Sequence, residues 1–274
     1  MSNAAVTDVR SLARQDPSSR PGPAGLPSLP AVPRLTFGRI AAVELRKTVD
    51  TRAGRWLLVL IGGLAIATVA WRVTHLTGGT ATFDSFVNMA VTGVALIVPV
   101  LGILAMTTEW TQRTALTTFT LAPRRGHVLA AKLLAALILT VLASLFAIAV
   151  AAAGLLLDGA ATSNTTDWTG WLTTAGGVLV ITTLNTLMGA AFGTLLGHTA
   201  ASVTWFYVAP NLVTLATNAL LQSRADWVSY YPALNRISTF DVSGRIPQLT
   251  VTMTVWIALP LAVGLIRCLR RNVT

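Results

Sequence analysis

Long uncharged stretches alternate with short charged ones along the chain, and this pattern predicts helices that cross a membrane. The uncharged runs cover 56–71, 85–108, 133–157, 168–223 and 246–266. Because a helix crosses roughly 30 Å of hydrocarbon with about 20 apolar residues, the fourth run is too long for one crossing. It breaks near Gly197-His198, which indicates two helices joined by a tight turn. The region 56–268 is therefore predicted to contain six spans, at approximately 56–74, 85–108, 128–157, 171–196, 200–222 and 247–267.

The segment 35–55, before the first span, is predicted to be an amphipathic helix that lies on the membrane. At about 100° per residue, Phe37, Ala41 and Val49 share one side, and charged residues take the other. Glu44 is the exception, because it projects on the apolar side. Its carboxylate either reaches water at the edge of the apolar stripe or is aimed at a partner group on the first or second span. The charged residues that we single out in this segment are Glu44, Arg46, Lys47 and Arg52.

Composition and charge placement support a multi-pass protein of the cell membrane. Charged residues make up 11% of the chain, against about 25% in an ordinary soluble domain, and the mean hydropathy is +0.66. The net charge is +10, but the basic residues cluster beside predicted span ends, which argues against a nucleic-acid partner. Their asymmetry follows the positive-inside rule and predicts that both termini are cytoplasmic. The tails 1–34, which is rich in Pro, Ser and Gly, and 269–274 are then cytoplasmic, and the first is expected to be disordered.

Small and polar residues within the spans suggest helix packing and a possible substrate path. Gly189, Gly193 and Gly197 recur at four-residue spacing, which allows close backbone approach, although a hinge is the alternative. The in-span amides could line a path or could form hydrogen bonds between helices. The aromatic loop 224–245 either anchors in the interface or dips back as a cap over a cavity. The candidate pathway residues are Asn185, Pro210, Asn211 and Asn218.

The chain lacks the residues that catalysis or ion coupling at membrane depth would need. Every Asp and Glu falls outside the uncharged runs, whereas ion-driven transporters place ionisable groups inside their spans. The sequence has no phosphate-binding loop and no HExxH motif, and Cys268 is its only cysteine. We therefore expect neither enzymatic activity nor a metal site, and we expect any energy for transport to come from another subunit.

The segment 109–127, between the second and third predicted spans, is dense in charge. Glu109 and Arg113 lie at i and i+4 and can pair along a helix. Pro123 then ends that helix, because proline is poorly tolerated in a helix interior. Arg124 and Arg125 open the third span, and Lys132 follows two turns later, where it can snorkel. These charges either orient the protein beside anionic lipid or form a docking surface.

The order of these motifs resembles the permease subunits of type-2 ATP-binding-cassette (ABC) transporters, notably the small bacterial six-span ones. The resemblance is carried by Glu44-Leu45-Arg46-Lys47, then by Glu109, Arg113-Thr114, Pro123-Arg124-Arg125-Gly126 and Ala131-Lys132. It implies that 109–127 is a coupling helix on a separate ATPase subunit, which holds the ATP and Mg²⁺. It further implies a second permease subunit, in a homo- or heterodimer, and export as the direction. The alternatives are an ion-coupled secondary transporter and a non-transporting membrane scaffold.

Overall fold

The computed structural model describes residues 36–75, 81–111, 125–162, 165–220 and 222–270. Helices dominate this part of the chain, so the predicted all-α class is confirmed. The predicted tail 1–34, residues 271–274 of the predicted tail 269–274 and most of the segment 109–127 lie outside the described residues. The helices are α2 (Phe37–Asp50), α3 (Arg52–His75), α4 (Phe83–Thr111), α6 (Arg125–Thr162), α7 (Trp171–Leu196), α8 (Thr199–Leu220), η2 (Gln222–Trp227), α9 (Tyr230–Ser238), α10 (Ile246–Met253), η3 (Thr254–Ala258) and α11 (Leu259–Arg270).

Five helical segments within the described ranges are long and apolar enough to cross a membrane. They are Arg52–His75, Phe83–Thr108, Gly126–Ala161, Trp171–Leu196 and Ile246–Arg270. The last runs through α10, the π-helical turn η3 and α11. The predicted fifth span, 200–222, corresponds to α8, a continuous helix of 22 residues. Thr, Asn and Pro interrupt its apolar sequence, and it is not among the five. The count of six therefore stays a prediction.

The helix predicted over 35–55 is divided at Thr51 into α2 and the start of α3. The Thr51 hydroxyl accepts a hydrogen bond from the Gly54 backbone N–H at 3.1 Å, which caps the new helix. A Cβ on Gly54 would lie 1.8 Å from the Thr48 carbonyl oxygen, so the turn requires glycine there. Arg52 consequently belongs to the first apolar helix, and the chain changes direction within one residue.

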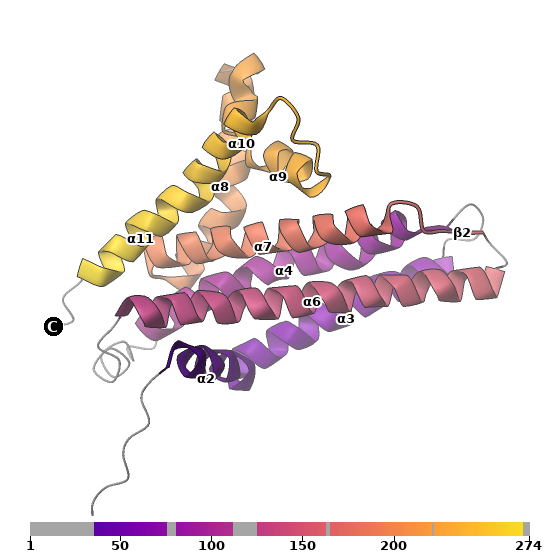
Figure 1. The fold of residues 1–274 in the computed structure, drawn as a ribbon, viewed down its shortest axis with the longest axis horizontal. Coiled ribbons are helices and arrows are strands. Elements are labelled where there is room, and N and C mark those ends of the chain that lie inside the picture. The colour runs from indigo at the N-terminus through magenta and orange to yellow at the C-terminus, as the bar shows by residue number, and fades with distance from the viewer. Residues whose placement is uncertain (1–35, 76–80, 112–124, 163–164, 221, 271–274) are drawn as a thin grey trace, which may run out of the picture. The chain divides into compact units, whose positions relative to one another are not determined.

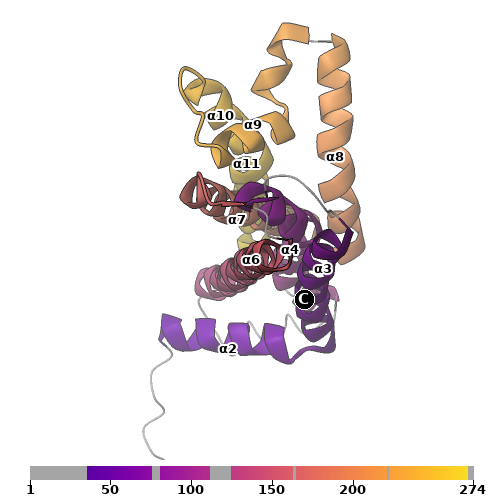
Figure 2. The ribbon, with the colours of Figure 1, turned by 90° about the vertical axis from the view of Figure 1, so that its right-hand side faces the viewer.

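Helices α3, α4, α6 and α7 pack alongside one another, and α2 crosses near the N-terminal end of α6 (Figure 1, Figure 2). Helices α4 and α7 approach each other closely. A Cβ on Gly189 would lie 2.4 Å from the Pro99 carbonyl oxygen, and one on Gly102 would lie 2.3 Å from the Thr186 carbonyl oxygen. The two backbones thus touch where side chains are missing, as expected of helices that associate in lipid.

Buried hydroxyl groups join α6 to α7. Thr140 and Thr186 share a hydrogen bond at 2.8 Å, and Ser144 donates to Thr182 at 2.8 Å. Each of these hydroxyls also lies within hydrogen-bond distance of a carbonyl oxygen of its own helix, at 2.7–2.9 Å, so each proton has a protein acceptor within reach. Hydrogen bonds between membrane helices contribute about 0.6 kcal/mol each on average. These bonds fix the register of the two helices rather than supply most of their stability.

The far end of α6 carries the chain's short β-ladder and a buried acid. Strands β1 (Ala81–Thr82) and β2 (Thr166–Asp167) pair in parallel and tie together the connections after α3 and α6. Asp167 accepts hydrogen bonds from the hydroxyl and the backbone N–H of Thr169, and these bonds lower the pKa of its carboxyl. Because α6 runs five residues past the predicted span end at 157, Asp158 lies inside the helix and is buried.

Candidate functional site

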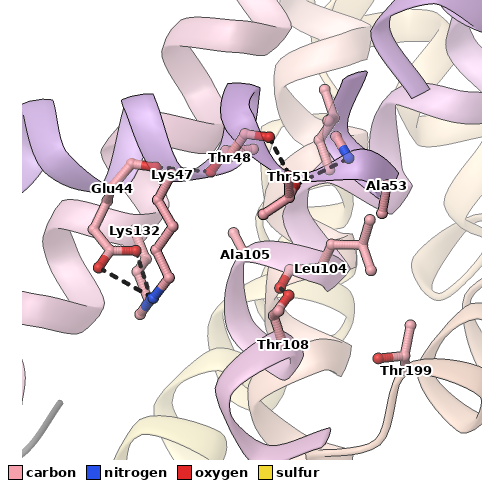
Figure 3. Close-up of a pocket in the computed structure, with 12 residues that line it drawn as sticks. Glu44, Lys47, Thr48, Thr51, Ala53, Leu104, Ala105, Thr108, Lys132 and Thr199 are labelled. Carbon is pink, nitrogen blue, oxygen red and sulfur yellow. Dashed lines mark hydrogen bonds and ion pairs between the residues drawn. The ribbon is translucent and has the colours of Figure 1, made fainter. Parts of the chain in front are cut away.

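The N-terminal end of α6 carries a buried ion pair with α2. The ammonium of Lys132 lies 2.6 Å from Oε2 of Glu44, and the two side chains are only 6% and 11% exposed (Figure 3). The Lys47 ammonium lies 3.9 Å from Oε1 of the same carboxylate and is 42% exposed. One carboxylate therefore faces two ammonium groups, one enclosed and one at the surface.

The pattern of α2 explains why Glu44 is enclosed. Ala41 and Glu44 are the buried residues of the helix, and Thr48 continues the same face one turn later. Phe37 and Val49, which the sequence places on the apolar side, are exposed instead. The helix turns its Ala41–Glu44–Thr48 face toward the bundle and leaves most of its larger apolar residues outside.

Glu44 thus takes the second of its two predicted roles, but its partner lies on the third predicted span rather than on the first or second. Lys132, which was expected to snorkel, is buried in the same contact. The other two residues singled out in the segment 35–55 are exposed. Arg46 pairs with Asp50 at 3.4 Å, and Arg52 begins α3.

A cavity of about 220 Å³ adjoins the ion pair. Its polar wall comes from α2, with Glu44 and Lys47, and from α6, with Lys132 (Figure 3). Its apolar wall comes from α4, with Leu101, Leu104 and Ala105, and Thr199 at the start of α8 contributes as well. Five helices therefore meet around one hollow at the end of the bundle where the predicted cytoplasmic charges gather.

The predicted coupling residues are only partly within the described structure. Arg113, Pro123 and Arg124 lie outside the described residues. Glu109 falls in the last turn of α4 and Arg125 is the first residue of α6, so both helices that flank the segment end at the same side as the Lys132 pair. The structure brings Lys132 together with Glu44.

The candidate pathway residues divide into a buried pair and an exposed pair. Asn185 is buried and accepts a hydrogen bond at 2.9 Å from the hydroxyl of Tyr230, which is fully buried in α9. Pro210 is buried in α8, whereas Asn211 and Asn218 are exposed on it. Asn211 donates to the Tyr231 hydroxyl at 3.4 Å, so Asn185 and Asn211 are linked through neighbouring tyrosines.

The aromatic loop 224–245 folds back against the bundle. Tyr230 packs with Phe192 and Trp256 in a buried cluster, and the Trp256 indole N–H donates to the Val228 carbonyl oxygen at 2.7 Å. Burial raises the pKa of the Tyr230 hydroxyl, and the neighbouring Tyr231 raises it further. The loop therefore fills the space beside α7 with the neutral, hydrogen-bonded side chain of Tyr230.

The three candidate packing glycines occupy different environments. Gly189 and Gly193 face the α4 backbone, and a Cβ on Gly193 would lie 3.1 Å from the Ile103 carbonyl oxygen. Gly197 ends α7 in the left-handed region with φ of 65°, and nothing lies within 4 Å of its Cβ position. Its role is to turn the chain from α7 into α8.

Sequence reasoning missed the pairing of Glu44 with Lys132 and the insertion of Tyr230. Both charges of the pair violated their local pattern, since one lay on an apolar face and the other inside a span. Two opposite charges displaced in this way could have been matched to each other. No sequence signal distinguished Tyr230 from the other aromatic residues of its loop.

The chain matches no protein-family model and none of the curated proteins with which we compared it. The class of this protein is therefore inferred from its own fold and site. It is an all-α protein whose apolar helices fit a multi-pass membrane protein, with a buried ion pair and a cavity at one end of the bundle. No cluster of three His, Cys, Asp or Glu side chains suited to a metal ion lies within the described ranges.

Proposed function

We propose that this chain is the transmembrane permease subunit of an ABC transporter. In this proposal it exports a substrate across the cell membrane with ATP hydrolysed on a separate ATPase subunit. A second permease subunit completes the pathway, and both termini face the cytoplasm. The observation that carries the proposal is the buried Lys132–Glu44 ion pair.

The position of this pair suits the transmission of force. Lys132 lies about two turns after Arg125, so it follows directly on the segment 109–127. Glu44 fastens the same point of α6 to α2. A buried pair is costly to break, because separation leaves an uncompensated charge in a poorly solvated place. A push on the segment would therefore move α2 and α6 as one body, which is what coupling to a motor subunit requires.

An ion-coupled secondary transporter is less well supported by the same residues. Within the described spans, carboxylates occur only near helix ends, at Asp84 and Asp158. Lys132 and Asp158 are 26 residues apart (158 − 132), which is about 39 Å along a helix at 1.5 Å per residue. That distance exceeds roughly 30 Å of hydrocarbon, so neither charge needs to lie at mid-membrane.

The proposal is tested first by co-purification. The full chain, tagged and extracted in a mild detergent, is expected to retain a soluble protein that carries a phosphate-binding loop, in about equal amounts. The complex should hydrolyse ATP. A chain that purifies alone and transports without ATP would overturn the proposal.

Neutralisation of the coupling segment provides the second test. Arg124→Gln with Arg125→Gln should reduce the ATPase subunit that co-purifies, without loss of membrane insertion. The matched control is Arg39→Gln with Arg46→Gln, which removes two positive charges from the exposed side of α2. If the control reduces co-purification equally, the charges act on lipid and the segment is not the docking surface.

A further inference from the structure

Helices α4 and α8 share a face that carries polar side chains along apolar helices. On α4, exposed residues recur every four positions from Asp84 to Leu96, and on α8 Asn211 follows Tyr207 by one turn. The Tyr207 hydroxyl donates to the Leu96 carbonyl oxygen, so the two rows meet at this contact. Beyond it α8 diverges from α4 (Figure 1, Figure 2). We call this surface the polar face; its side chains are Asp84, Asn88, Thr92, Tyr207, Asn211 and Asn218.

Hydrocarbon is a poor surrounding for the polar face. In the six-span arrangement, Asn211 lies twelve residues after Thr199 and nine before Leu220, near the middle of a crossing helix. Its side chain and that of Asn88 are exposed, so no part of the described chain covers them. A polar group is costly in hydrocarbon, and polar side chains of membrane helices therefore face protein or a water-filled cavity. The exposed amides indicate a surface that meets water, a ligand or another polypeptide rather than lipid.

The hydrogen-bonding capacity left on this face consists mostly of acceptors. The side-chain N–H groups of Asn211 donate to the Tyr207 carbonyl oxygen at 2.7 Å and to the Tyr231 hydroxyl at 3.4 Å. Asn88 donates to Oδ2 of Asp84 at 2.9 Å. Among the described residues, no donor reaches the side-chain oxygen of Asn88 or Asn211. A ligand that offers N–H donors therefore fits these oxygens.

The charge of the polar face is negative. Asp84 is the one charged residue among the described side chains of α4 and α8, and it is exposed in the first turn of α4. Arg72 of α3 approaches the same turn, but its guanidinium donates to the Ser85 hydroxyl at 2.9 Å and lies 4.7 Å from the centre of the Phe86 ring. Within the described ranges it forms no ion pair with Asp84. A carboxylate together with free acceptor oxygens favours a cation over an anion.

Two tyrosine rings lie beside the acceptor oxygens. The Tyr231 hydroxyl is 3.4 Å from the Asn211 side chain, and Tyr207 precedes Asn211 by one turn. Aromatic rings attract cations and also provide apolar contact. We propose that the polar face binds an organic cation, an ammonium group on an apolar body, and that such a cation is the transported substrate. The second half of this statement rests on the function proposed above, whereas binding is a property of this chain alone.

Fluorescence titration of the detergent-solubilised full chain, without an ATPase subunit or ATP, tests the site. Dansylcadaverine carries an ammonium group, and its N-acetyl derivative has the same fluorophore but no charge. We expect the ammonium probe to bind more tightly. Asp84→Asn should weaken its binding about fivefold, as the loss of one exposed charge pair predicts, and should leave the acetylated probe unaffected. Asp50→Asn removes the same charge from the exposed end of α2 and should leave both probes unaffected.

A second variant tests hydrogen bonding without a change of charge. Asn211→Leu removes the free side-chain oxygen and should weaken both probes, since each carries an N–H donor, while the protein still elutes as the wild type does in size exclusion. Equal binding of the two probes to the wild type, equal loss in Asp84→Asn and Asp50→Asn, or unchanged binding in Asn211→Leu would each overturn the assignment. Dissociation of a dimer in Asn211→Leu would overturn it as well, because the face would then serve contacts between copies of the chain.

Failure of cation binding and failure of the transporter function give different results. A chain that co-purifies with an active ATPase but does not prefer the ammonium probe is a permease for another substrate, which overturns only the cation site. A chain that prefers the ammonium probe but purifies without an ATPase supports the cation site and overturns the ABC function.

Discussion

At the scale of single residues, burial decides how much each ion pair contributes. The Arg46–Asp50 pair is exposed at 86% and 56%, and exposed pairs contribute about 0.2–1 kcal/mol. The Lys132–Glu44 pair is almost enclosed, so the cost of removing its charges from water offsets much of their attraction. Its contribution is therefore to fix where α2 lies on α6, and removal of only one partner leaves the other charge in a poorly solvated place without its 2.6 Å contact.

The first prediction concerns the two halves of that pair. Glu44→Gln and Lys132→Met should each lower the free energy of unfolding by about 3–5 kcal/mol, whereas the double variant should lose less than the sum of the two. Arg46→Gln is the exposed control and should change it by less than about 1 kcal/mol. Denaturant unfolding of the solubilised protein measures all four. Single variants as mild as Arg46→Gln would show that the pair is not enclosed.

The second prediction concerns the buried hydroxyl of Tyr230, which lies against α7. Because burial raises the pKa of Tyr230 in the folded chain, its stabilising contribution is fully present below the unfolded tyrosine pKa of about 10. Above that pH the unfolded phenol ionises while the folded one stays neutral, so stability falls as pH rises. Tyr230→Phe should reduce this alkaline loss, measured as unfolding midpoint against pH, whereas Tyr231→Phe, on an exposed neighbour, should retain it.

At neutral pH, Tyr230→Phe should lower the free energy of unfolding for a separate reason. Tyr230→Phe removes the donor to the buried Asn185 carbonyl oxygen, and an unsatisfied buried polar group costs about 1–3 kcal/mol. Tyr230→Phe that unfolds like the wild type at neutral pH would contradict the insertion of α9 beside α7.

At the scale of helices, the structure depends on where side chains are missing. Gly189 and Gly102 let α4 and α7 touch, and Gly54 lets the chain turn from α2 into α3. The sequence pattern identified Gly189, because it repeats at four-residue spacing with Gly193 and Gly197. It did not identify the turn at Thr51, because the cap by the Thr51 hydroxyl and the close approach of Gly54 to the Thr48 carbonyl oxygen show only in the folded chain.

The third prediction compares two glycines in apolar helices. Gly189→Ala should destabilise the protein, because its Cβ would lie 2.4 Å from the Pro99 carbonyl oxygen and would force α4 and α7 apart. Gly63→Ala, with nothing within 4 Å of the added Cβ, should be neutral or stabilising, since alanine favours a helix over glycine by up to about 1 kcal/mol. Thermal unfolding in one detergent compares the two variants directly. Equal effects would contradict the close approach of α4 and α7.

At the scale of the whole molecule, apolar run lengths predicted the class and most of the helix positions. That information is local, because the apolar residues of a segment indicate by themselves whether the segment lies in lipid or in water. The contacts between distant segments were less accessible. Glu44 and Lys132 are 88 positions apart in sequence, and Tyr230 and Asn185 are 45 apart, so the local pattern around each residue did not show which residues meet. Helix length was also underestimated where a charge such as Asp158 lies buried near a helix end.

The membrane topology depends on α8, and it provides the last prediction. With 22 residues, α8 is about 33 Å long, enough to cross roughly 30 Å of hydrocarbon despite its Thr and Asn content. If it crosses together with the five apolar helices, the two termini lie on one side; if it does not, they lie on opposite sides. His198, before α8, and Asp241, beyond it, are both exposed and report on the difference. In a Cys268→Ser background, Asp241→Cys should react with a membrane-impermeant maleimide in intact cells, whereas His198→Cys and Arg46→Cys should react only after permeabilisation. Labelling of His198→Cys together with Asp241→Cys in intact cells would show that α8 stays on one side, and the six-span arrangement would be wrong.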